Sequence, residues 1–143
     1  MIKTRRMRLL ALSFVLLGCS GPTSSAGTYI TQAPGFVMML QIEPGSGDKI
    51  DGTISSVQVL SNGEISALRK PISGTIDDKA VNFSIIYPPG NDPTSVPVTG
   101  IMTDQGLELT FFVHGHSTSA TFRKGKAEEF SAIAQSIQNQ SNK

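Results

Sequence analysis

The stretch Phe36-Val37-Met38-Met39-Leu40-Gln41-Ile42 is the clearest guide to the fold of this chain. Every second residue from Phe36 to Ile42 carries a large apolar side chain. Successive side chains of a strand point to opposite faces, so this period of two is typical of a β-strand with one face on a hydrophobic core. The stretch therefore predicts a half-buried strand.

The same alternation returns along the chain. The further apolar sets are Val81, Phe83, Ile85 and Tyr87; then Leu107, Leu109, Phe111 and Val113; and, more weakly, His116, Thr118, Ala120 and Phe122. Between Ile50 and Leu60 the apolar phase changes after Ile54, which predicts a bulge near Ser55-Ser56. Several strands with one buried face are thus expected.

Turn signals separate these runs. Asn62-Gly63 predicts a tight hairpin with positive φ at both residues. Similar places are taken by Gly45-Ser46-Gly47-Asp48, Asp77-Asp78 and Asp104-Gln105-Gly106. The proline-rich stretch from Pro88 to Pro93 is expected to form the longest loop.

A short motif with a central glycine occurs three times, at residues 50–54, 72–76 and 98–102. The glycine is expected to mark a point where the sheet coils sharply or a neighbouring strand packs closely.

With 143 residues and 38% hydrophobic content, the chain fits one domain. We expect a mainly β fold, an antiparallel meander of seven or eight strands that forms a small barrel or a strongly curved sheet. In strand pattern alone it is similar to lipocalin-like and avidin-like barrels.

Near the C-terminus the apolar period changes. Phe130, Ile133, Ala134 and Ile137 follow the spacing of one helix face, and Ala127 extends it. This predicts a helix over about 126–138, with fraying beyond it. The helix is expected to close an edge or end of the sheet, with Phe130, Ile133 and Ile137 buried; a helix that binds a partner is the alternative.

The N-terminus has the pattern of a secretory signal. MIKTRRMR carries four cations, and the apolar run from Leu9 to Leu17 follows it. That run is far shorter than the ~20 residues that a membrane-spanning helix needs. Residues 1–18 are therefore expected to be a cleaved signal peptide.

The end of this run, Leu16-Leu17-Gly18-Cys19, resembles the lipobox of bacterial lipoproteins. The resemblance implies that the Cys19 sulfur receives a diacylglycerol, that cleavage occurs before Cys19 and that the new amino group is acylated. An ordinary secretory signal with a chance or buried cysteine is the alternative. Residues 19–27 are then a lipidated flexible tether and residues 28–143 the globular domain.

A diacylated or triacylated N-terminus anchors a protein stably to a membrane. By resemblance to Gram-negative lipoproteins, Ser20 rather than Asp after the cysteine favours the outer membrane, facing the periplasm. A Gram-positive source is the alternative.

Without the four cations of the signal, the chain has 8 basic and 11 acidic residues, so its net charge is near −3. No basic stripe or aromatic platform remains, so no nucleic-acid partner is expected.

The sequence offers weak candidates for catalysis or metal binding. His114-Gly115-His116 lacks carboxylate or cysteine partners at ligand spacing, so His114-Gly115 is expected to form a hairpin turn. Asp77-Asp78 is expected in a solvated turn, since adjacent strand residues point to opposite faces. There is no Gly-x-Ser-x-Gly motif. We therefore expect no enzyme, no bound metal and no cofactor.

We expect a membrane-anchored envelope lipoprotein that acts as a non-catalytic interaction module, binding a protein partner or acting as an inhibitor. The alternatives are a barrel that binds a small apolar ligand and a purely structural envelope component. The expectation depends on bulky inward residues filling a small barrel; these are Phe36, Met38, Leu40, Phe83 and Phe111. An empty interior would favour the ligand-binding alternative.

Overall fold

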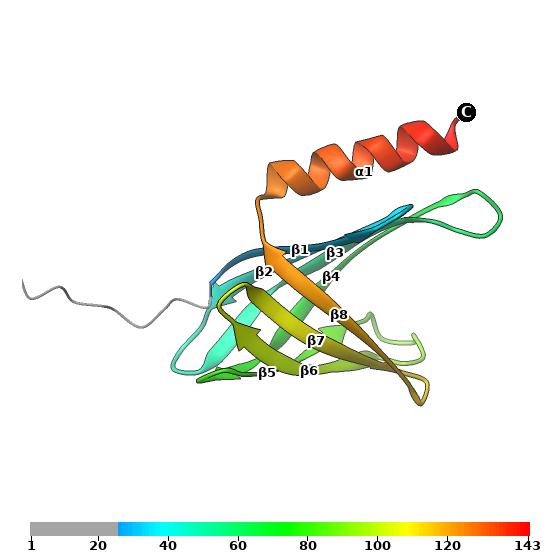
Figure 1. The fold of residues 1–143 in the computed structure, drawn as a ribbon. Coiled ribbons are helices and arrows are strands. Elements are labelled where there is room, and N and C mark those ends of the chain that lie inside the picture. The colour runs from blue at the N-terminus through cyan, green and yellow to red at the C-terminus, as the bar shows by residue number, and fades with distance from the viewer. Residues whose placement is uncertain (1–25) are drawn as a thin grey trace, which may run out of the picture.

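The computed structural model describes residues 26–143, which form eight strands followed by one helix (Figure 1). The strands are β1 (Gly27–Ala33), β2 (Phe36–Pro44), β3 (Lys49–Val59), β4 (Ile65–Asp77), β5 (Ala80–Ile86), β6 (Ser95–Thr103), β7 (Gly106–Val113) and β8 (His116–Lys124), and the helix is α1 (Ala127–Ser141). The expected signal peptide, the lipidation of Cys19 and most of the tether lie outside the described residues.

Each strand pairs antiparallel with the next, and β1 pairs with β8, so the sheet closes into a barrel. This confirms the mainly β meander, with eight strands and a barrel rather than an open curved sheet. β1 begins one residue before the expected start of the domain, because Gly27 pairs with Ile42. The ladder therefore takes in the last residue of the stretch that was expected to be tether.

The barrel interior holds the main hydrophobic core. Its largest fully buried members come from the alternating positions, among them Leu40, Ile54, Leu107, Leu109 and Phe122. These side chains share the inner face because the β2–β3, β3–β4 and β7–β8 ladders pair residue for residue, which keeps the alternation in phase. Burial of this apolar area is the main stabilising contribution to the barrel.

The expected bulge near Ser55-Ser56 is wrong. β3 pairs residue for residue with both β2 and β4 through these serines. Val57 instead points outward and is buried, at 6% exposure, against the helix. The apolar phase changes because both faces of β3 are covered at this point.

Two turns test the hairpin predictions. His114 (φ 48°) and Gly115 (φ 77°) form the predicted two-residue turn between β7 and β8. Asn62-Gly63 lies in a hairpin as predicted, but the connection spans residues 60–64 and the positive φ belongs to Gly63 alone of the pair. The Asn62 side chain accepts a hydrogen bond from the Glu64 amide at 3.0 Å, which favours this longer loop.

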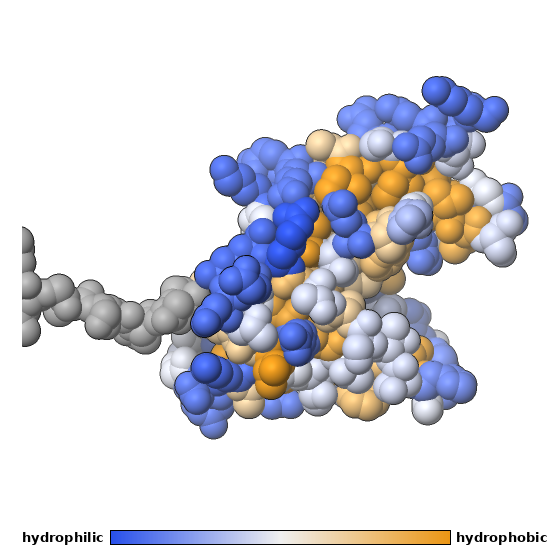
Figure 2. Space-filling view, viewed as in Figure 1, coloured by the Kyte–Doolittle hydropathy of each residue, from blue (hydrophilic) through white to orange (hydrophobic). Residues whose placement is uncertain are grey.

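Helix α1 lies on the outer face of β2 and β3 rather than at an edge or end of the sheet (Figure 1). A second hydrophobic cluster of the domain lies between the helix and the barrel. It consists of Ile30, Val37, Met39, Val57, Ala134 and Ile137, with Ile65, Ala127, Phe130 and Ile133 partly buried around it. Of the three large residues expected to be buried, only Ile137 is fully so. Figure 2 shows apolar surface between the helix and the barrel.

The helix is longer than predicted. It continues to Ser141 instead of fraying after Gln138, and the Ser141 hydroxyl donates a hydrogen bond to the Gly63 carbonyl at 2.6 Å. At the other end, the Arg123 guanidinium binds the Glu129 carboxylate and lowers its pKa. Both groups are exposed, so the pair contributes little to stability.

All eight strands, the helix and both hydrophobic clusters belong to residues 27–141. The domain therefore contains a closed barrel and its own core, which are the requirements for independent folding. Within the described part of the chain, no helix is both long and apolar enough to cross a membrane.

Candidate functional site

The barrel is closed at one end and splayed at the other. β1 and β8 pair only at Tyr29–Lys124 and Ile30–Arg123, and the β4–β5 ladder stops at Ile72–Ile85. Beyond these points the halves β1–β4 and β5–β8 separate, as Figure 1 shows for β1 and β8. We call the end that carries the β1–β2, β3–β4, β5–β6 and β7–β8 connections the open end, and the opposite end the closed end.

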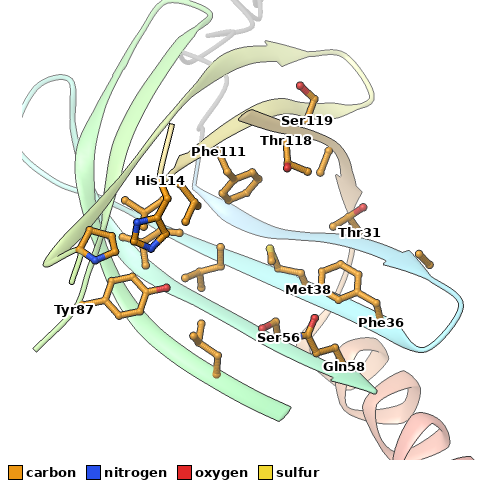
Figure 3. A pocket seen from close by; sticks show the side chains of 18 of the residues that line it. Thr31, Phe36, Met38, Ser56, Gln58, Tyr87, Phe111, His114, Thr118 and Ser119 are labelled. Atoms are coloured by element: carbon orange, nitrogen blue, oxygen red, sulfur yellow. The ribbon is translucent and has the colours of Figure 1, made fainter. Parts of the chain in front are cut away.

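A cavity of about 920 Å³ lies between the two halves at the open end. Its volume falls in the range of small-molecule sites, about 300–1,000 Å³. Its lining residues are Thr31, Gln32, Ala33, Phe36, Met38, Ile54, Ser56, Gln58, Leu68, Ile85, Tyr87, Asn91, Asp92, Pro93, Val96, Phe111, Val113, His114, Thr118, Ser119 and Ala120. Figure 3 shows most of these side chains, which converge from both halves of the barrel.

The cavity has an apolar floor. Ile54, Ile85 and Val96 are buried and line it from three different strands. Of the residues expected to fill the barrel, Leu40 and Phe83 are packed in the core, whereas Phe36, Met38 and Phe111 line the cavity. The interior is thus filled towards the closed end and empty towards the open end.

Glycines explain why the packed part lies at the closed end. A Cβ at Gly52, Gly74 or Gly100 would overlap a backbone carbonyl oxygen of the neighbouring strand, that of Gln41, Asn82 or Glu108 respectively. These are the central glycines of the repeated motif, so the expected close approach is confirmed. Strands that approach this tightly coil sharply and leave no empty space between them.

Neutral polar side chains stand around the apolar floor. Tyr87 points its hydroxyl into the cavity from one side, and Thr31 and Thr118 lie on the side where β1 and β8 separate (Figure 3). Ser56 lies between these two groups. The few polar groups offer hydrogen bonds to a ligand that is otherwise apolar.

A cation lies next to Tyr87. The Lys70 ammonium is 5.6 Å from the centre of the Tyr87 ring, in the geometry of a cation–π contact. Lys70 opposes Ile54 in the β3–β4 ladder, so its side chain starts from the inner face of the barrel. Lys70 was not among the residues singled out from the sequence, although its two-residue spacing from Leu68 and Ile72 placed it on the inner face.

The residues considered from the sequence as candidates for metal binding or catalysis lie at different places in the structure. His114 lines the rim of the cavity, whereas His116 starts β8 and is exposed. At the closed end, Asp77 ends β4 and Asp78 begins the β4–β5 turn; both are exposed, as predicted for a solvated turn. Across residues 26–143, no three His, Cys, Asp or Glu side chains gather in a way that would hold a metal ion.

The chain matches no family model, no curated protein and no solved structure. The functional argument therefore depends on the cavity and on the residues around it.

Proposed function

We propose that this protein is a lipid-anchored envelope protein whose barrel binds a small, largely apolar ligand in the open-end cavity. The observation that carries the proposal is the cavity itself, of about 920 Å³ with an apolar floor. A barrel whose only task is to present its outer surface gains stability by filling its interior, since empty apolar volume forfeits packing energy.

The walls suit such a ligand. Strands provide the floor, and their ladders hold Ile54, Ile85 and Val96 in place before any ligand arrives. Transfer of apolar ligand surface from water to this floor contributes about 25 cal/mol per Å² buried. Ser56 and the Tyr87 hydroxyl supply the polar contacts that orient a ligand.

The position of the N-terminus fits a tethered binding protein. β1 starts at the closed end, so the chain that precedes Gly27 joins the domain opposite the cavity opening. The anchor itself rests on the resemblance of residues 16–19 to a lipobox. A short tether at the closed end leaves the opening free to exchange ligand.

The proposal is tested by titrating residues 26–143 with the neutral apolar dye N-phenyl-1-naphthylamine. We expect saturable fluorescence enhancement with one site per domain, and competition by other small apolar molecules. A folded domain, verified by circular dichroism, that gives no saturable signal with the dye would refute ligand binding in the cavity.

A second candidate, the interaction module, is supported by the exposed apolar residues. Five of the six exposed large hydrophobic residues within residues 26–143 lie at the open end, and we call these five the open-end rim: Val59, Leu60, Ile86, Phe112 and Val113. The sixth, Ile101, lies towards the closed end of β6. Apolar side chains gathered around an opening are typical of a surface that contacts a partner.

A further inference from the structure

We propose that the ligand is an amphipathic anion, whose acidic head binds Lys70 and Tyr87 and whose apolar chain lies along the cavity. This inference rests on the proposed function and specifies the class of ligand. The observation behind it is that Lys70, a charged residue, lies on the inner face of the barrel.

Lys70 lies on the inner face of the barrel, between the apolar Leu68 and Ile72 of the same strand. Of the charged residues within the described strands, only Lys70 and Lys124 fall on the inward register, opposite Ile54 and Tyr29. Lys124 ends β8 and is exposed at the closed end. Lys70 lies within β4 and is partly buried, and its ammonium lies 5.6 Å from the centre of the Tyr87 ring.

The Lys70 ammonium lies where the two halves of the barrel part. The β4–β5 ladder ends at the Ile72–Ile85 pair. If it continued for two more residues towards the open end, Lys70 would lie opposite Tyr87. The strands separate instead, and the Lys70 side chain spans the gap to the Tyr87 ring. The Tyr87 phenol lines one side of the cavity, and the Lys70 ammonium lies next to the Tyr87 ring, just outside the lining itself.

Within residues 26–143, no carboxylate forms an ion pair with this cation. In the described part of the chain the ion pair formed is Arg123–Glu129, and none involves Lys70. Asp92 lines the outer part of the cavity, but it lies exposed in the β5–β6 connection and makes no ion pair with Lys70. An anionic head at Lys70 would supply the missing counter-charge and accept a hydrogen bond from the Tyr87 hydroxyl.

The rest of the cavity fits an apolar chain. From Tyr87 the lining continues through Met38 and Phe111 towards the opposite side, where β1 and β8 separate (Figure 3), and Leu68 is a further apolar lining residue. One ammonium and one hydroxyl match a monoanionic head such as a carboxylate. A dianionic phosphate would call for more donors, such as an arginine fork or several amides.

The experiment compares two competitors of equal chain length, dodecanoate and 1-dodecanol, in displacing N-phenyl-1-naphthylamine from residues 26–143 at about pH 8, where a carboxylic acid is ionised. We expect dodecanoate to bind at least tenfold more tightly, equivalent to about 1.4 kcal/mol. Lys70→Met should abolish this preference while dye binding persists. Arg69→Met, on the outward register of the same strand, should leave the preference unchanged.

A third variant distinguishes loss of the positive charge from a structural effect of the substitution. Lys70→Arg keeps the charge and should retain the preference for the carboxylate, even if Lys70→Met weakens all binding. Equal affinities for dodecanoate and 1-dodecanol in the unmodified domain would overturn the inference and leave the proposed function standing. Absence of dye binding from the unmodified domain would instead overturn the proposed function.

Discussion

The rings of Phe111 and Phe122 lie 6.3 Å apart, tilted by 37°, at the boundary between the filled and the empty part of the barrel. Phe122 is fully buried in the core, whereas Phe111 lines the cavity. Both belong to the inward register of adjacent strands. One alternating pattern thus supplies both the stabilising core and the wall of a binding site.

Filling the cavity should abolish ligand binding without unfolding the domain. Ser56 lies on the inner face of β3 and lines the cavity, so Ser56→Phe places a ring in the empty space. We expect the loss of N-phenyl-1-naphthylamine binding by fluorescence titration. Ser73→Phe on β4, which is exposed on the outer face, is the matched control and should bind normally. Unchanged binding by Ser56→Phe would place the dye elsewhere.

The helix should contribute to stability through Ile137. This residue is 6% exposed between α1 and the barrel, and truncation of a buried Ile costs about 2–5 kcal/mol. A small domain has only about 5–15 kcal/mol of stability, so Ile137→Ala should lower the melting temperature clearly in a thermal denaturation experiment. Gln138→Ala, the exposed neighbour, should not. Equal melting temperatures for the two variants would contradict structural packing of the helix.

The close approach at the glycines should be sensitive to a single methyl group. In Gly74→Ala the new Cβ meets the Asn82 carbonyl and the Phe83 backbone, which cannot move aside as a flexible side chain does. We expect destabilisation of about 1–3 kcal/mol in urea denaturation. Ser73→Ala, the exposed neighbour on the same strand, should change stability by much less. A Gly74→Ala domain as stable as the original would show that the strands there have room to separate.

The N-terminus should be lipidated at Cys19. Intact-mass measurement of the membrane-extracted protein should show residues 1–18 missing and an acylglycerol adduct on the remainder. Cys19→Ser removes the only sulfur that can accept the lipid, because the chain has one cysteine. That variant should stay as precursor or appear in the soluble fraction. A mature chain with an unmodified Cys19 would disprove the anchor.

The open-end rim offers a test of the interaction module. Phe112 is 42% exposed at the open end, and Ile101 is 50% exposed towards the closed end. If a protein partner binds the rim, Phe112→Ser should reduce its recovery in a cross-linked pull-down from membranes, whereas Ile101→Ser should not. Equal recovery with both variants would argue against the rim as the contact surface.

The sequence predicted the strands well because successive side chains of a strand point to opposite faces, so a strand with one buried face needs an apolar residue at every second position. Phe83 and Leu109 are buried where the alternation placed them, and His114-Gly115 forms the predicted turn because local backbone preferences decide it. The bulge at Ser55-Ser56 was wrong for the opposite reason. Val57 is apolar because of the distant helix, and a local pattern does not show which element covers a face.

By itself, then, the sequence determined the order of the strands, their inward faces and the existence of the helix, because each depends on neighbours within a few residues. Only the tertiary structure decided that the barrel closes and that its halves separate at one end, leaving Phe36, Met38 and Phe111 around a cavity. It also decided that Lys70 meets Tyr87 across the gap. These features depend on contacts between strands far apart in the chain, on the coiling that the glycines allow, and on how much of the interior the side chains fill.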